Sequence, residues 1–518
     1  MRHINLQNLP LIASVIIIAF IMLFGNPSPQ EFTLTLPQTQ PNQLTTQHYI
    51  EDYQYLYEII KTNYPYLTLK NRTHHTNWLD RKTTTIASLQ NCTTNTEFLK
   101  IITTEITALH NRHSRLLTPT EVQEYHNTFA NIPFMAEIFS LQVAEANQQW
   151  QIYFLDQYTA TNKRYSVEII YDRGNYIICT RQGSTITPYG TNLTVTHINN
   201  IPIHIAITTA PTYIDHDTTH DQPYIWAITP TTYPDANFTI RYPNGTETKL
   251  TLPTLYGTPR TNYYPAENLI TQTYPEYNTA YIYMKTFDPS TTTELAPNIN
   301  AFLEETRDYD YLIIDIRGNT GGSFNSWITT LVKPLIQEPT PHHYYLAYRN
   351  NPYILSFHDN YLKDKTPIQK TSLPNLPFEA QTNDYKIYNW TNIYTPENTI
   401  NHNAKRILLT DRTIYSAAEG FTNYCKQTGF ATIIGTTTGG DGFFVWPMYI
   451  VLPNSKLVIT ATSSMSLDQD GYANEEKRTT PDIIHETNIT DHHELIEYTL
   501  NLIQRGEIPS KQKNNYLN

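Results

Sequence analysis

Cysteine is scarce in this sequence, and basic side chains are fewer than acidic ones. Among 518 residues there are 3 cysteines, and 35 lysines and arginines stand against 47 aspartates and glutamates. The net charge of −12, without any run rich in lysine or arginine, argues against binding to nucleic acid. Three cysteines cannot build a disulfide framework, and at most one pair can form; they are Cys92, Cys179 and Cys425.

The spacings that bind metal ions are also missing, although histidine is plentiful. The pairs His74–His75, His342–His343 and His492–His493 lie outside any His-x-x-x-His or Cys-x-x-Cys context. Cys425 lies on an apolar helix face, which predicts a buried thiol rather than a nucleophile. We therefore expect neither a metal site nor a cofactor.

The N-terminus carries the one long apolar run of the sequence. Arg2 precedes apolar residues from 9 to 24, a run shorter than the roughly 20 residues of a comfortable membrane span. It suits the core of a signal peptide or a short signal anchor. No small-x-small cleavage site follows this run. Residues 1–30 are therefore slightly more consistent with an uncleaved anchor than with a cleaved signal peptide. A Pro/Gln/Thr-rich linker follows at 31–47, so we expect the bulk of the chain to be periplasmic or on the cell surface.

Helical spacing of apolar residues predicts an N-terminal helical region at 48–127. Thr94 and Glu97 form the pattern of a capping box for a helix from Phe98 to Leu109. Phe98, Leu109 and His113 share one face of that helix. His113 is therefore predicted at its C-terminal end or just beyond it.

Strand-like alternation predicts a β-rich connecting segment at 128–180, including 150–154 and 165–170. A small β module is predicted at 181–257, with a hairpin whose turn is Asn244-Gly245.

Residues 258–505 follow an α/β pattern, before a tail at 506–518. Apolar strands are predicted at 279–284 and 312–316, as in the middle of a parallel sheet. A polar, Tyr-rich insertion at 339–403 interrupts the pattern, which then resumes with a helix at 417–428 and strands that include 456–460.

A glycine-rich turn follows the strand that ends at Asp315. The sequence from Asp315 to Gly322 reads Asp-Ile-Arg-Gly-Asn-Thr-Gly-Gly, which is neither a P-loop nor a dinucleotide fingerprint. Its backbone N–H groups, at the carboxyl end of a sheet, can hold a developing oxyanion. A plain structural turn is the alternative.

Ser416 opens the predicted helix 417–428 after a strand and a short turn. This position offers a nucleophile the amides and the positive dipole end of a helix. The alternative interpretation is an ordinary N-cap serine.

Read together and in this order, these segments resemble the tail-specific protease family of serine peptidases, family S41, whose relatives include the tricorn core protease. The match covers nearly all of the chain beyond the anchor, through 435–440 to the Pro-Asp motif at 481–482. The resemblance implies a multidomain α+β fold. A helical N-terminal subdomain, a PDZ-like module at 181–257 and a ClpP/crotonase-like α/β catalytic domain at 258–505 are its parts.

The family has two catalytic versions, and the resemblance favours the tricorn-like Ser-His-Glu version. In the Ser/Lys version a lysine stands where this sequence has Asp441, which we expect to make local hydrogen bonds in its turn. His113 matches the tricorn-like general base better than His110 does. Glu475, six residues before Pro481, matches the acid that orients the histidine.

The resemblance also assigns accessory positions. Glu476 is the fallback for the acid, and Ser114 matches a second serine beside the histidine of some relatives. The oxyanion hole is expected from the amide of Ala417 and that of Gly321 or Gly322.

The predicted activity is hydrolysis of peptide bonds through an acyl-enzyme, either endoproteolytic or at C-terminal segments, with a peptide or protein as substrate. The alternative is a catalytically inactive protein on the same fold that binds peptides or apolar ligands, as the retinoid-binding relatives do.

Overall fold

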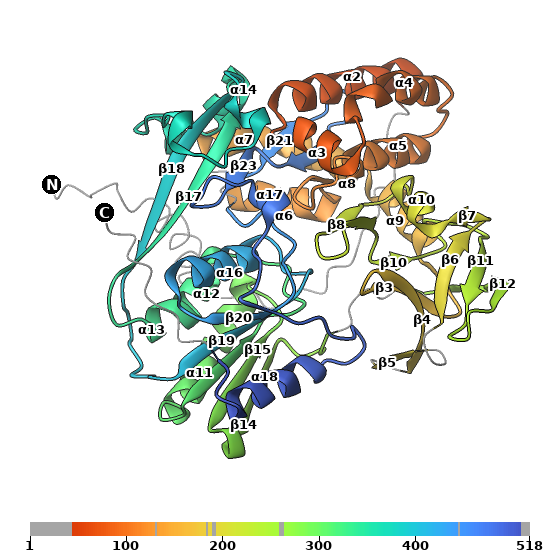
Figure 1. The fold of residues 1–518 in the computed structure, drawn as a ribbon. Helices are drawn as coiled ribbons and strands as arrows, with labels where there is room; N and C mark the ends of the chain where they lie inside the picture. The colour runs from red at the N-terminus through yellow and green to blue at the C-terminus, as the bar shows by residue number, and fades with distance from the viewer. Residues whose placement is uncertain are drawn as a thin grey trace. The chain divides into compact units, whose positions relative to one another are not determined.

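The computed structural model describes residues 44–129, 132–182, 185–188, 193–257, 264–443 and 446–508 (Figure 1). The predicted anchor and most of the linker lie outside these ranges, so both stay predictions. Within the described ranges, no helix has the length and apolarity needed to cross a membrane. The described residues belong to one unit, 41–518.

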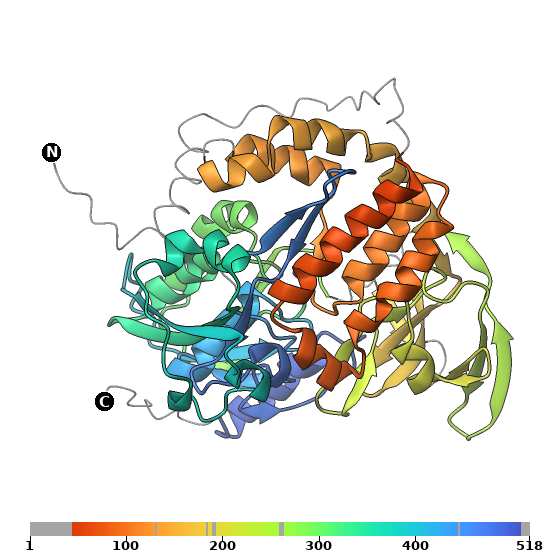
Figure 2. The same ribbon diagram turned by 90° about the horizontal axis from the view of Figure 1, so that it is seen from above.

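Four helices occupy the N-terminal part: α2 (Thr46–Asn63), α3 (Leu67–His74), α4 (Lys82–Gln90) and α5 (Asn95–Thr107). Figure 2 shows α2, α4 and α5 side by side in red and orange, and α4 contacts both of the others. The predicted capping box of α5 is confirmed, because the Thr94 hydroxyl accepts from the Glu97 N–H and Glu97 accepts from the Thr94 N–H.

The β-rich prediction is wrong for residues 133–161, which form helices α7 (Pro133–Ile138), α8 (Leu141–Gln148) and α9 (Gln151–Thr161). The alternation around Trp150 does not reflect a sheet face. The Trp150 ring packs against Phe98 of α5, and its indole N–H donates to the carbonyl of Ser455. Long-range packing overrides the local pattern here.

The β module is built on one eight-stranded sheet whose main path runs in the order β10-β3-β4-β6-β11-β12, while β5 (Thr185–Pro188) pairs with β4 and β7 (Ile201–Pro202) pairs with β6. The predicted hairpin with its Asn244-Gly245 turn is confirmed, and Gly245 takes a φ of 83°. The predicted boundary at 181 is wrong, because it cuts β4 and leaves β3 outside. The strands of the main path are β3 (Glu168–Asp172), β4 (Asn175–Gln182), β6 (Thr194–Ile198), β10 (Ala227–Ile228), β11 (Asn237–Arg241) and β12 (Glu247–Thr251).

A six-stranded sheet in the order β14-β15-β16-β19-β20-β24 carries the predicted α/β pattern. All neighbours pair in parallel except β14, which is antiparallel to β15 at the edge. The strands are β14 (Leu269–Tyr274), β15 (Thr279–Met284), β16 (Tyr311–Asp315), β19 (Lys405–Thr410), β20 (Thr432–Gly435) and β24 (Ile483–Ile484).

Helices cover both faces of this sheet, which explains why its central strands are apolar throughout. Along β15, Ala280 and Ile282 join the core beneath α11 (Pro289–Glu305) and α16 (Ala417–Thr428), whereas Tyr281 joins the core beneath α18 (Glu494–Gln504) (Figure 1).

The predicted insertion 339–403 is part of the main core. It holds two long antiparallel strands, β17 (Thr340–Arg349) and β18 (Tyr385–Tyr394), and β17 also pairs with β23 (Ser464–Leu467). Buried residues of β17 and β18 share one apolar cluster with those of α2 and α5.

A small sheet ties the segment after α5 to the C-terminal half of the chain. Strand β1 (Arg115–Leu116) pairs with β22 (Val458–Ala461), which pairs with β21 (Met448–Val451). The strand predicted at 456–460 therefore exists, but it belongs to this sheet and not to the parallel one. Because His113 lies directly before β1, this pairing fixes where His113 enters the site.

Candidate active site

Ser416 stands at the junction between the loop after β19 and the start of α16. Its φ of 57° lies in a region that a serine rarely adopts, and such a conformation costs on the order of 1–3 kcal/mol. Its hydroxyl caps no backbone N–H of the helix. The interpretation of Ser416 as an ordinary N-cap is therefore wrong, because the side chain points elsewhere.

The Ser416 hydroxyl points to His113. Oγ of Ser416 lies 2.9 Å from Nε2 of His113, and the imidazole packs against the ring of Tyr415. The loop after α5 is held in shape because Oδ1 of Asn111 accepts from the backbone N–H of His113. The two residues named from the sequence as nucleophile and base are thus in hydrogen-bonding distance.

The other ring nitrogen of His113 faces Asp441 and not Glu475. Nδ1 of His113 lies 2.9 Å from Oδ2 of Asp441, whose side chain is fully buried. The expectation that Asp441 bonds only within its own turn is wrong. Its carboxylate accepts from groups far away in the sequence: Tyr66 Oη, Asn111 Nδ2, Tyr415 Oη and Ser466 Oγ, at 2.9 to 3.2 Å.

These bonds decide the charge of Asp441. Burial alone raises the pKa of this carboxyl, but the hydrogen bond and charge of His113 and the bonds from Asn111 and Tyr66 outweigh burial. The net result is a pKa below its usual value, so Asp441 is ionised at neutral pH. An ionised carboxylate at Nδ1 places the proton of a neutral imidazole on Nδ1 and leaves Nε2 as the acceptor for the Ser416 hydroxyl.

Glu475, the predicted orienting acid, is paired with Lys70, whereas Asp441 occupies the position at Nδ1 of His113. Glu475 lies on helix α17 (Asn474–Lys477), where Oε1 accepts from Nζ of Lys70 at 2.5 Å, and both side chains are buried. The backbone of Gly440 packs against Asn474 and Glu475, so the turn that carries Asp441 lies between α17 and the serine. Burial raises the pKa of Glu475, Lys70 opposes this, and the charge of Asp441 adds to it.

The accessory residues lie at the margin of the site or outside it. Glu476 is partly exposed and forms a bidentate ion pair with Arg72, so it cannot replace Glu475. The Ser114 hydroxyl donates to Oδ1 of Asn111 and accepts from the N–H of Thr462, away from the Ser416 hydroxyl.

His110, the alternative base, is buried in a separate environment. Its ring stacks on His74, and its Nδ1 accepts from the N–H of Ile214. Burial lowers the pKa of His110 to about 3, and the nearby Lys70 contributes in the same direction. His110 is therefore held neutral, with its Nδ1 occupied.

The glycine-rich turn lies directly against the serine. A Cβ at Gly321 would come within 2.8 Å of the Ser416 Cβ and 3.0 Å of the Ala417 nitrogen, so only glycine fits there. The N–H of Gly321 itself donates to Oδ1 of Asn319. Among the described residues, no acceptor is bonded to the N–H of Gly322 or of Ala417, and these are the two expected donors that remain.

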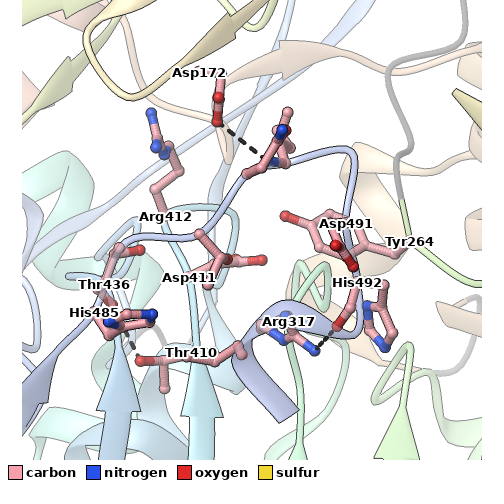
Figure 3. Close-up of a pocket in the computed structure, with 14 residues that line it drawn as sticks. Asp172, Tyr264, Arg317, Thr410, Asp411, Arg412, Thr436, His485, Asp491 and His492 are labelled. Carbon is pink, nitrogen blue, oxygen red and sulfur yellow. Dashed lines mark hydrogen bonds between the residues drawn. The ribbon is translucent and has the colours of Figure 1, made fainter. Parts of the chain in front are cut away.

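A small cavity of about 40 Å³ behind this turn shows how the turn is held (Figure 3). Arg317 donates to both carboxylate oxygens of the fully buried Asp315 and to the carbonyl of His492. The N–H of Gly318 donates to Asp411 and Thr413. The polar groups around the cavity bond to one another and fix the end of β16 relative to the loop that carries Ser416.

Residues 278–485 match the family described as peptidase family S41. No curated protein sequence matches the chain. The crystal structure of mature CPAF is similar with a TM-score of 0.53 at 13% identity, covering 90% of this chain and 99% of that chain. The structure of mature CPAF complexed with lactacystin has a TM-score of 0.51 at 13% identity, covering 89% of this chain and 98% of that chain. A photosystem II D1 C-terminal processing protease has a TM-score of 0.40 at 13% identity, covering 90% of this chain and 99% of that chain.

A serine at the start of a helix, with its hydroxyl 2.9 Å from an imidazole nitrogen, is the arrangement found in serine hydrolases. Residues 278–485 thus match a family of serine peptidases, and this match supports a serine peptidase activity for the chain.

Proposed function

We propose that Ser416 is the nucleophile of this peptidase, His113 its general base and Asp441 the acid that orients His113. One observation carries the proposal. The imidazole of His113 bridges the Ser416 hydroxyl and the Asp441 carboxylate, with 2.9 Å on each side. Nucleophile and base in hydrogen-bonding contact, with the base oriented by a third group, is the geometry that activates a serine.

In the proposed reaction, Nε2 of His113 takes the hydroxyl proton as Oγ of Ser416 attacks the carbonyl carbon of the scissile peptide bond. The imidazolium then gives this proton to the nitrogen of the leaving amine, and an acyl-enzyme forms on Ser416. A water molecule, deprotonated by His113, attacks the ester carbonyl, and the imidazolium returns the proton to Oγ of Ser416 as the new carboxyl end leaves. Asp441 stays ionised and stabilises the imidazolium in both half-reactions.

The oxyanion of each tetrahedral intermediate is proposed to bind the N–H groups of Ala417 and Gly322. The N–H of Ala417 is the first of helix α16, where the helix dipole favours negative charge. Gly321, whose amide is bonded to Asn319, serves as the close-packed spacer that brings Gly322 to the serine. Removing one such donor typically costs 10²–10³-fold in rate.

The substrate is proposed to be a peptide or protein outside the cytoplasm. The apolar residues 9–24 behind Arg2 support export and an N-terminal anchor. The eight-stranded sheet of the β module supports a PDZ-like role, in which an extended substrate segment pairs with a strand edge. A non-catalytic binding function is not favoured, because a binder has no need of a serine activated by a histidine.

The test is covalent labelling of the full chain with a fluorophosphonate probe, which reacts only with activated serines. Wild type is expected to be labelled at Ser416, and Ser416→Ala and His113→Ala are expected to show no labelling. Ser88→Ala, which removes an exposed hydroxyl on α4, is the matched control and is expected to label as wild type does. An unlabelled but folded wild type would contradict the proposed mechanism.

A further inference from the structure

A cavity of about 670 Å³ opens beside the proposed catalytic residues. Its lining includes Arg112 and Ser114, the two neighbours of His113 in the sequence. It also includes Gly318 and Thr320, from the turn that leads to Gly321. The cavity therefore borders both the base and the oxyanion turn, and its volume is in the range of pockets that bind ligands.

Its charge is positive, in a chain whose net charge is −12. Among the described residues the lining holds two cations, Arg112 and Lys285, and no aspartate or glutamate. Glu267, next to the lining residue Asn268, is exposed and does not contribute to the wall. We call this space, defined by Arg112, Ser114, Trp226, Lys285, Gly318 and Thr320, the basic cavity.

Arg112 is a fixed cation of the basic cavity. Its guanidinium lies over the rings of Tyr213 and Trp226 at 5.4 and 5.6 Å, and it donates to Oδ2 of Asp215 at 2.8 Å. Oδ1 of the same carboxylate accepts from Arg478 at 2.5 Å. The charge of Arg112 is thus compensated within a buried cluster, because Asp215 accepts from both guanidinium groups and the Glu475 carboxylate also acts on Arg478.

Lys285 is the second cation, and it has no carboxylate partner among the described residues. Its Nζ donates to the carbonyl of Ala266 at 2.9 Å. It directly follows β15, at the carboxyl end of the parallel strands, where ligands bind in open α/β sheets. A lysine ammonium with one backbone acceptor keeps two N–H groups for a ligand.

We propose that the basic cavity is a specificity subsite for an acidic side chain, Asp or Glu, of the peptide substrate, and that Lys285 is its specificity-determining residue. The subsite rests on the proposed function, because it places this side chain within two residues of the bond that Ser416 attacks. The aromatic face of Trp226 and the hydroxyls of Ser114 and Thr320 would contact the stem and carboxylate of the bound residue. A lysine or arginine of the substrate is repelled by the same charges.

The experiment has two steps. A peptide library is digested by the full chain, and the cleaved bonds are identified by mass spectrometry. A well-cleaved peptide is then made in three forms that differ at one position near the bond: Glu, its neutral isostere Gln, and Lys. The kcat/KM of each is measured for wild type, Lys285→Met, Lys285→Glu and a control, Lys249→Glu, which makes the same charge change on the exposed strand β12.

Wild type and Lys249→Glu are expected to prefer the Glu peptide over the Gln peptide by roughly two- to five-fold, since a partly exposed ion pair is worth up to about 1 kcal/mol. In Lys285→Met the ratio of kcat/KM for the Glu peptide to that for the Gln peptide falls to about one. In Lys285→Glu the order inverts, so that the Lys peptide becomes the best of the three. Labelling by the fluorophosphonate probe stays unchanged in all variants, since Lys285 does not touch the reacting groups.

Enrichment of apolar, aromatic or phosphorylated residues in place of Asp and Glu would overturn the subsite. So would equal cleavage of the three peptides by wild type. In these cases labelling of Ser416 persists and the proposed function stands. Loss of both labelling and cleavage in wild type contradicts the proposed function, and the subsite with it.

Discussion

Two buried carboxylates lie on neighbouring turns of this peptidase and have opposite partners. Asp441 accepts from a histidine, an amide and three hydroxyls, and its pKa is lowered. Glu475, behind the Asp441 turn, accepts from Lys70, and burial keeps its pKa raised. The comparison teaches that the acid of a catalytic relay is identified by which carboxylate reaches the imidazole. The number of residues between a carboxylate and a sequence motif, such as Pro-Asp at 481–482, is not sufficient to identify this acid.

The largest effect is expected from Asp441→Asn. The amide can donate to Nδ1, which then favours the tautomer with the proton on Nε2, so the imidazole no longer accepts the Ser416 proton. A decrease in kcat/KM of about 10⁴-fold is expected, as for the corresponding change in a serine protease triad. Steady-state kinetics on a cleaved peptide measures it, and a loss smaller than ten-fold would assign the orienting role to another group.

Glu475→Gln is expected to affect stability first. The change leaves the buried Lys70 ammonium without its counter-charge, which typically destabilises by about 3–5 kcal/mol. Chemical denaturation measures the loss, and at low temperature the folded variant should keep kcat/KM within about ten-fold of wild type. The double variant Lys70→Met/Glu475→Met removes both charges and should recover part of the stability. Equal stability of Glu475→Gln and wild type would contradict the ion-pair interpretation.

Glu419, a third buried carboxylate, extends the comparison to a group whose hydrogen bonds come from neutral side chains, with only the more distant charge of Arg478 acting on it. It accepts from Asn474 and Thr479, and burial raises its pKa to about 7, although these bonds oppose the shift. Because the folded state binds the proton more tightly than the unfolded state, wild-type stability should decrease as pH rises from about 4.5 to about 7.

Glu419→Gln imitates the protonated form and removes this pH dependence. At pH 8 the variant should be more stable than wild type by about 3 kcal/mol, whereas at pH 4.5 the two should be equal. Unfolding free energies at both pH values test this. A variant that is less stable at pH 8 would show that Glu419 is ionised and stabilising in the folded state.

The smallest effect is expected from Glu476→Gln. Its partner Arg72 is partly exposed and also contacts Glu379, so the ion pair is worth about 1 kcal/mol or less. Stability and kcat/KM should both stay near wild type. A loss of stability as large as that of Glu475→Gln would contradict the expectation that exposure to solvent weakens the Arg72–Glu476 ion pair.

The sequence predicted the parts of the site that depend on local order in the chain. The strand, turn and helix around Ser416 and the helix end before His113 follow from periodicity and capping, and the resemblance to family S41 linked them. Asp441 was missed because its partners Tyr66, Asn111 and Ser466 are far apart in the sequence. A signal existed, since Asp441 occupies the position of the lysine base in the Ser/Lys version, which faces the serine.

The fold was predicted best where both faces of a strand are buried, as in β15 and β16. It was predicted wrongly where tertiary contacts decide. Residues 150–154 alternate like a strand, but Trp150 packs on α5 and the segment is helical. The strand predicted at 456–460 overlaps β22, Val458–Ala461, but its sheet is set by the pairing with β1, which no local pattern reveals.

The most direct measurement of the central claim is the rate of fluorophosphonate labelling of Ser416 in Asp441→Asn and Glu475→Gln, side by side at a temperature where both are folded. If Asp441 orients His113, labelling of Asp441→Asn is slower than wild type by several orders of magnitude, and Glu475→Gln labels within about ten-fold of wild type. The reverse order, with Glu475→Gln unreactive and Asp441→Asn active, would contradict the account and assign the orienting role to Glu475.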